Sequence, residues 1–195
     1  MEPYITKKLR VLQFPITKEN IKQLRTDSLI PHYVDDVGII EYIEIFGFMT
    51  HHVRKLKAKI ILELGTRKGN STRILADACK PFGGKVYTID KVRADWEPYD
   101  KEHFDNIEFV TGDIRDLVWN HGNIDILYID ADHDAFNVFT ELERFGRKAK
   151  CIMLHDVYGE ENSKQIREAI AVWCRANGRP FVIYPGHCGL GVISE

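Results

Sequence analysis

Residues 130–134 read Asp-Ala-Asp-His-Asp and follow directly on the apolar stretch at 124–129. Three carboxylates and one imidazole therefore fall within five positions. Carboxylate and imidazole groups bind divalent cations and move protons near neutral pH. A site for metal binding and proton transfer is one interpretation, and an acidic helix start or a solvated loop are the others. Asp is also a common helix N-cap, so either Asp132 or Asp134 is expected to cap the next helix.

The order of elements along the chain decides where this cluster lies. Short apolar runs alternate with amphipathic helical patterns from residue 59 onward, and the last two runs are separated only by a glycine-rich turn, so they must pair as a hairpin. The pattern predicts an α/β fold: a doubly wound, Rossmann-like, seven-stranded, mostly parallel sheet with an antiparallel terminal hairpin strand. The predicted strands are 59–64, 84–90, 107–113, 124–130, 149–156, 181–184 and 191–193. Helices are expected at 35–53, at 70–80 with Asn70 as N-cap, through 138–145, and from Asn162, which forms a capping pair with Gln165.

Ligands of such sheets bind at the carboxyl ends of the strands, so the residues there carry the functional signal. Gly65 and Gly69 allow a sharp turn and a close backbone approach after the first strand. Their G-x-x-x-G spacing differs from the G-x-G-x-x-G of dinucleotide folds. Asp90 is placed to accept the hydroxyls of a ribose, and Asp113 to meet a purine edge. Together they predict a nucleoside ligand.

The segments ELGTRKGNST, YTID, VTGD and DILYID, at these separations, resemble the class I S-adenosylmethionine-dependent methyltransferases. The resemblance covers roughly residues 37–195. It implies that Glu63, Gly65 and Ser71 lie around the methionine part of the cofactor, Asp90 on the ribose, and Asp113 with Ile114 at the adenine. The full cofactor-binding set that it implies is Glu63, Gly65, Thr66, Gly69, Ser71, Asp90, Asp113, Ile114 and Asp130.

Within that family, DADHDAF resembles the small-molecule O-methyltransferases of the catechol, caffeoyl-CoA and macrolide-sugar types. This resemblance implies that Asp130 holds Mg²⁺ or Mn²⁺, that His133 removes the acceptor proton, and that His155 and Asp156 complete the metal site. The resembling enzymes place a carboxylate or amide where this chain has His155. Three alternatives follow: a nitrogen ligand suited to Mn²⁺ or another transition metal, a metal-free site in which His155 is a base or hydrogen-bonding group, or a site without catalysis. Adjacent residues on a strand point to opposite faces, so His155 and Asp156 can share one ion only where the strand has ended.

Composition limits the kinds of molecule that the protein is expected to bind. The formal charge of −2 argues against a general nucleic-acid binder. The sequence contains no run of about 18 apolar residues, so it does not predict a membrane-spanning helix. The four cysteines form no C-x-x-C pair. A soluble, cytoplasmic protein is expected, and a homo-oligomer is left open.

The N-terminal part does not follow the strand–helix repeat. Residues 1–36 are expected to be an appendage to a methyltransferase domain at 37–195. Candidate walls of an acceptor pocket are the aromatic residues Tyr33, Tyr42, Phe46 and Trp96, for which core packing is the alternative, and the polar segment after Asp90 is a candidate acceptor loop.

The sequence thus predicts an enzyme, an S-adenosylmethionine-dependent O-methyltransferase, with Asp130 and His133 as its catalytic residues. Its acceptor would be a hydroxyl of a small molecule such as a sugar or a secondary metabolite. A cofactor-binding scaffold without transferase activity and a nicotinamide-dependent oxidoreductase are the alternatives.

Overall fold

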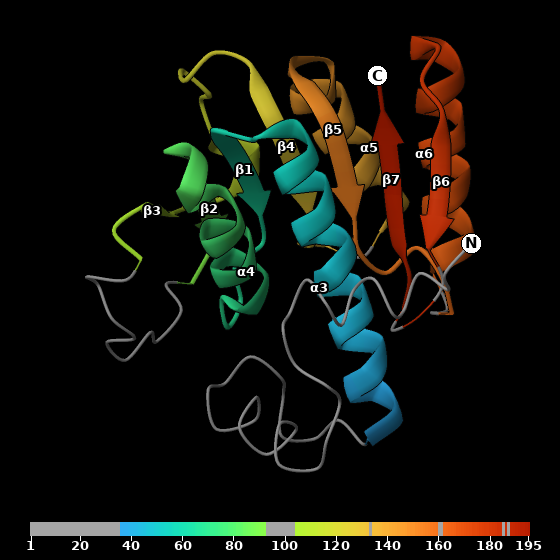
Figure 1. Cartoon of the computed structure of the whole chain (residues 1–195). Helices are drawn as coiled ribbons and strands as arrows, with labels where there is room; N and C mark the ends of the chain where they lie inside the picture. The colour runs from blue at the N-terminus through green and yellow to red at the C-terminus, as the bar shows by residue number, and fades with distance from the viewer. Residues whose placement is uncertain (1–35, 93–103, 133, 160–161, 185, 187) are drawn as a thin grey trace.

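The computed structural model describes residues 36–92, 104–132, 134–159, 162–184, 186 and 188–195 (Figure 1). Seven strands form one sheet in the order β3-β2-β1-β4-β5-β7-β6. β7 runs antiparallel to β5 and β6, and the other pairings are parallel. The predicted sheet, including its terminal hairpin, is confirmed. The strands are β1 Ile60–Leu64, β2 Lys85–Asp90, β3 Ile107–Thr111, β4 Ile124–Ile129, β5 Ala149–Leu154, β6 Phe181–Tyr184 and β7 Leu190–Ser194.

Helices cover both faces of the sheet (Figure 1). The α-helices are α3 Asp36–Leu56, α4 Asn70–Cys79, α5 Ala135–Phe145 and α6 Ser163–Asn177, and the 3-10 turns are η1 Lys80–Phe82, η2 Ile114–Asp116 and η3 Gly146–Lys148. Buried residues of α3 and α4 share one core cluster, and those of α5 and α6 share the other. The chain is thus a three-layer sandwich in which the sheet is the middle layer.

The alternation of side chains along β4 explains the two core clusters. Ile126 and Tyr128 pack with α3 and α4, whereas Leu127 and Ile129 pack with α5 and α6. Both faces of the strand are therefore buried, which is typical of parallel sheets with helices on each side and accounts for its continuous apolar sequence. Phe46 of α3 is 7% exposed and belongs to the first of these clusters, so it is a core residue.

Helix starts depart from the sequence prediction at two of three places. Gly69, in the left-handed region with φ 69°, is the N-cap of α4, so the prediction that Asn70 is the cap is wrong. Asn162 does precede α6, but its side chain makes no capping bond there. The carboxylate of Asp134 caps α5 by accepting from the backbone N–H groups of Phe136 and Asn137, as predicted for one of the two acids.

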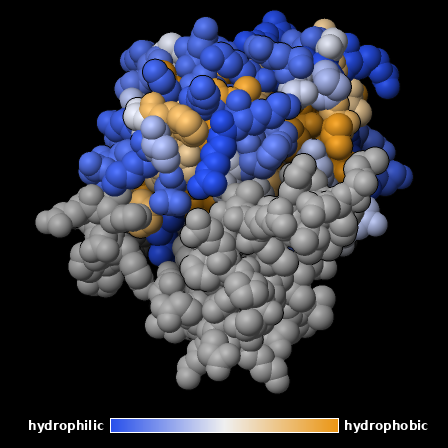
Figure 2. Space-filling view, in the orientation of Figure 1, coloured by the Kyte–Doolittle hydropathy of each residue, from blue (hydrophilic) through white to orange (hydrophobic). Residues whose placement is uncertain are grey.

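No helix in the described part of the chain is long and apolar enough to cross a membrane. The described surface on the α3 side is mostly hydrophilic, with apolar residues showing in small groups between the hydrophilic ones (Figure 2). The predicted division into an appendage at 1–36 and a domain at 37–195 stays a prediction, since residues 1–35 lie outside the described part.

Candidate active site at the carboxyl edge of the sheet

The carboxyl ends of β1, β2, β4 and β5 meet at one edge. Three backbone hydrogen bonds extend the pairing of these strands one step past their ends: Gly65 N–H to Ile89 O at 2.9 Å, Asp130 N–H to Leu64 O at 2.9 Å, and His155 N–H to Ile129 O at 3.0 Å. The sheet itself therefore fixes the first residue of each loop after β1, β4 and β5. The side chains that the sequence singled out at 63–72, 90, 130 and 155–156 gather here.

The glycine loop after β1 is fixed by backbone geometry and by Asp90. Gly65 has φ +94°, and a Cβ at this residue would lie 2.2 Å from the carbonyl oxygen of Asp130. The backbone N–H groups of Thr66 and Arg67 both donate to Asp90 Oδ2, at 3.0 and 2.8 Å. The other oxygen, Oδ1, accepts from Val92 N–H at 3.3 Å. Asp90 therefore ties the loop after β1 to the end of β2 and still presents a half-buried carboxylate at the predicted ribose position.

Glu63 lies beneath this loop and is fully buried. Its carboxylate accepts from the hydroxyls of Ser71, at 2.6 Å, and Thr72, both in the first turn of α4. Burial raises the pKa of Glu63 to about 7, against the lowering effect of these hydrogen bonds. Glu63 and Ser71 thus bind each other and set the start of α4. Their predicted place around the methionine part of a cofactor stays a prediction.

Asp113 and Ile114 follow β3 at the predicted adenine position. The Asp113 carboxylate accepts from the backbone N–H of Arg115 at 2.9 Å and pairs with its guanidinium at 2.6 Å. Arg115 holds the pKa of Asp113 well below its usual range, so this carboxylate is ionised at neutral pH. Arg144 of α5 donates to the carbonyls of Ile114 and Leu117, at 2.6 and 2.8 Å, and anchors the turn.

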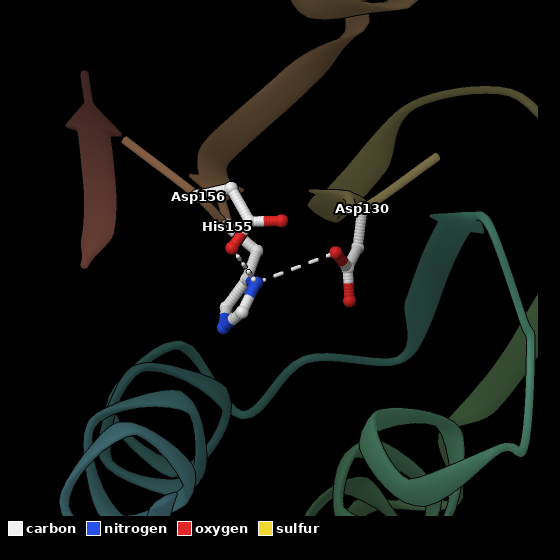
Figure 3. Close-up of side chains that lie close together, drawn as sticks. All are labelled: Asp130, His155 and Asp156. Carbon is white, nitrogen blue, oxygen red and sulfur yellow. Dashed lines mark ion pairs between the residues drawn. The ribbon is translucent and has the colours of Figure 1, made fainter. Parts of the chain in front are cut away.

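Asp130, His155 and Asp156 converge beyond β4 and β5 (Figure 3). His155 Nδ1 lies 2.9 Å from Asp156 Oδ1 and 3.4 Å from Asp130 Oδ1. β5 ends at Leu154, and Asp156 takes the left-handed φ of 56°, so the two adjacent side chains turn toward one point. This backbone turn meets the condition set by the sequence for a shared ion. One ligand atom from each residue lies within 4.8 Å of the others, and no second group of this kind occurs in the described ranges.

Charge decides the protonation of His155 when no cation is present. Burial by itself would lower its pKa, but the carboxylates of Asp130 and Asp156 outweigh burial and raise the pKa to about 10. The imidazole is then a cation at neutral pH and donates its Nδ1 proton to the two carboxylates. A cationic imidazole cannot accept a proton, which argues against His155 as the base of a metal-free site.

The fit of a divalent cation can be judged from the donor set. Ligand atoms about 2.1 Å from one ion lie roughly 3 to 3.5 Å apart when they are neighbours in its coordination shell. The separation of 3.4 Å falls in this range, and that of 2.9 Å lies at its lower edge. Two carboxylates and one imidazole suit Mn²⁺ and other transition metals better than Mg²⁺, which prefers oxygen. The residues present therefore fit such an ion.

Comparison with known proteins agrees with this geometry. Residues 62–157 match the family model of a methyltransferase domain. This chain therefore contains a methyltransferase domain. No curated protein matches it.

Solved structures share the fold of this methyltransferase at low sequence identity. An O-methyltransferase from Bacillus cereus in complex with SAH has 19% identity and a TM-score of 0.63, covering 97% of this chain and 96% of that one. TomG from Streptomyces achromogenes, an O-methyltransferase involved in tomaymycin synthesis solved with SAM, has 14% identity and a TM-score of 0.64, and both chains are covered fully. A methyltransferase from Geobacter sulfurreducens has 22% identity and a TM-score of 0.63, covering 92% and 98%.

Several predicted residues of the methyltransferase lie outside the described part of the chain. His133, the predicted base, is one, and most of the candidate acceptor loop after Asp90 is another. Tyr33 and Trp96 are not described, nor is the side chain of Tyr42. Their roles stay predictions.

Three residues were not predicted from the sequence: Arg144 and Tyr128, which contact residues of the site, and Glu141, a buried acid on α5. Arg144 holds the turn after β3 from a position thirty residues away. The Tyr128 hydroxyl donates to Asp130 Oδ2 at 3.2 Å. Glu141 is 5% exposed on α5, and its Oε2 finds no hydrogen-bond partner among the described residues. A charged residue on the apolar face of α5 was a visible signal for Glu141, and the two-residue spacing on one strand was a signal for Tyr128 beside Asp130. The partners of Arg144 are set by a tertiary contact.

Glu141 is expected to make the stability of the protein depend on pH. Burial, together with the charges of Asp132 and Asp134, raises its pKa to about 8. The unfolded chain releases this proton near pH 4.5, so ionisation costs folding free energy that grows as pH rises from about 4.5 to 8. In the wild type this ionisation should lower the free energy of unfolding by on the order of 3 kcal/mol between pH 5 and pH 8.5. Glu141→Gln should remove that decrease, as measured by urea unfolding at both pH values. Glu143→Gln is the control, because Glu143 lies on the same helix and pairs on the surface with Arg147. An unchanged slope in Glu141→Gln would contradict the prediction.

Proposed function

We propose that this methyltransferase transfers the methyl group of S-adenosylmethionine to a hydroxyl oxygen of a small molecule, assisted by a divalent cation held by Asp130, His155 and Asp156. The convergence of these three side chains beside the glycine loop carries the proposal. The O-methyltransferases from Bacillus cereus and Streptomyces achromogenes with the same fold support transfer to oxygen. The glycine spacing and the methyltransferase match argue against a nicotinamide cofactor.

The proposed cofactor position follows the edge of the sheet. Asp90 would accept the ribose hydroxyls, Asp113 and Ile114 would meet the adenine, and Thr66 and Gly69 would line the loop near the methionine part together with Glu63, Gly65 and Ser71. Asp130 lies between this loop and His155, so its carboxylate would face both cofactor and acceptor. The sulfonium methyl is already activated, so the protein's main tasks are to align the acceptor oxygen with it and to remove the oxygen's proton.

The bound cation would lower the pKa of the acceptor hydroxyl and hold the oxygen in place. As the new O–CH₃ bond forms, the bond from sulfur to that methyl breaks, and S-adenosylhomocysteine leaves with the electron pair of the broken bond. His133 is the proposed acceptor of the hydroxyl proton, three residues after Asp130. His155 and Asp156 would stay ligands throughout.

The proposed function is tested by incubating metal-depleted protein with methyl-labelled S-adenosylmethionine and a panel of catechols, sugars and other hydroxyl compounds. Label should appear on a hydroxyl oxygen after Mn²⁺ is added, more weakly with Mg²⁺, and should disappear after EDTA treatment. Transfer that survives complete removal of divalent cations would refute the metal, and transfer only to amines would refute the acceptor class.

Asp90→Ala should weaken binding of S-adenosylhomocysteine by about 10- to 100-fold. The carboxylate both supplies charge-assisted bonds to the ribose, worth about 1.5–3 kcal/mol, and anchors Thr66 and Arg67 of the glycine loop. Calorimetric titration measures the change. Asp105→Ala is the matched control, because that carboxylate pairs with Lys80 on the surface. Equal affinities in Asp90→Ala and the wild type would remove Asp90 from the cofactor site.

A further inference from the structure

The Tyr128 side chain reaches the candidate metal site from inside the core. Tyr128 lies on β4, is 2% exposed, and packs its ring in the cluster with α3 and α4. Its hydroxyl donates to Asp130 Oδ2 at 3.2 Å. A buried phenol normally requires a hydrogen-bond partner, and here that partner is a carboxylate of the site.

Because of this hydrogen bond, the two carboxylate oxygens of Asp130 have different partners. Oδ2 accepts from Tyr128, and Oδ1 faces His155 Nδ1 at 3.4 Å. Tyr128 and Asp130 are two residues apart on an extended backbone, so their side chains leave the same side of the sheet. The Asp130 N–H is held by Leu64 O at 2.9 Å. Backbone and carboxylate are thus both fixed, and Oδ1 is left facing the other two ligands.

We propose that Tyr128 is a positioning residue that fixes the Asp130 carboxylate for cation binding. The inference rests on the proposed function, because it concerns the same three ligands. Tyr128 is not itself a ligand: the group whose donor atoms converge consists of Asp130, His155 and Asp156. Partners of this kind orient metal-binding side chains and sharpen their affinity.

Tyr128→Phe removes the hydroxyl and keeps the ring in the core. The variant should bind Mn²⁺ about 10- to 100-fold more weakly than the wild type in calorimetric titration of metal-depleted protein. Its affinity for S-adenosylhomocysteine should stay within threefold of the wild type. Tyr87→Phe is the matched control, because Tyr87 lies on β2 and packs against Trp119 and His121 on the opposite face of the sheet. That variant should bind Mn²⁺ as the wild type does.

A double-mutant cycle separates positioning from a general effect on packing. If Tyr128 acts through Asp130, adding Tyr128→Phe to Asp130→Asn should cause no further loss of Mn²⁺ affinity. Additive losses would overturn the proposal, as would a Tyr128→Phe variant with wild-type Mn²⁺ affinity or one that loses S-adenosylhomocysteine affinity to the same extent. If the wild type itself binds no Mn²⁺, that result refutes the metal in the proposed function and, with it, the role of Tyr128.

Discussion

Asp130→Asn should lower the rate of methyl transfer by about 10²- to 10³-fold while S-adenosylhomocysteine still binds within tenfold of the wild type. The substitution keeps the size of the side chain and removes its negative charge. That charge lies 3.4 Å from His155 Nδ1, in the group that fits a divalent cation. Without it the site has one carboxylate fewer to bind the ion and to orient the acceptor. Initial rates at saturating S-adenosylmethionine, with the acceptor found in the panel, measure the effect.

Asp132→Asn is the control for this prediction. Asp132 lies two residues further along, is exposed, and pairs at 3.6 Å with Lys91. Its substitution should change the rate by less than about threefold, because exposed ion pairs contribute little. Equal losses in the two variants would show that the segment responds to charge in general and would remove the special role of Asp130.

Gly65→Ala should destabilise the protein by about 3–5 kcal/mol and abolish measurable cofactor binding. A Cβ at this residue would lie 2.2 Å from Asp130 O and 2.8 Å from the Ala131 Cα, both backbone atoms that cannot turn aside. The φ of +94° adds strain for any residue with a Cβ. Relief would require β1 and β4 to separate where the site is built. Thermal unfolding and titration with S-adenosylhomocysteine measure both consequences.

Gly83→Ala separates the two causes. Gly83 also has a positive φ, +67°, but a Cβ there would meet nothing within 4 Å. The Gly83→Ala variant should be destabilised only by this backbone strain, about 1–2 kcal/mol, and should bind the cofactor as the wild type does. A Gly65→Ala variant no less stable than Gly83→Ala would mean that the close approach of β1 and β4 is not limiting.

The fold was predictable because its signals are local. Apolar runs bounded by glycine and acids marked each strand within about two residues, and the short turn before 190 required a hairpin rather than a crossover. Helix caps were less predictable. Asn70 and Gly69 both suit the start of α4, and the left-handed backbone at Gly69 decides between them.

The sequence by itself determined which side chains reach the carboxyl edge of the sheet, because each follows a parallel strand and parallel strands end on the same side. It placed Asp90, Asp113, Asp130, His155 and Asp156 there in this way. Only the tertiary structure decided how they face one another. The left-handed turn at Asp156 turns its side chain toward that of His155, and the pairing of β4 with β5 brings His155 within 3.4 Å of Asp130. The physical reason is that strand order follows from local patterns, whereas hydrogen-bond partners depend on backbone turns and on contacts between segments far apart in the chain.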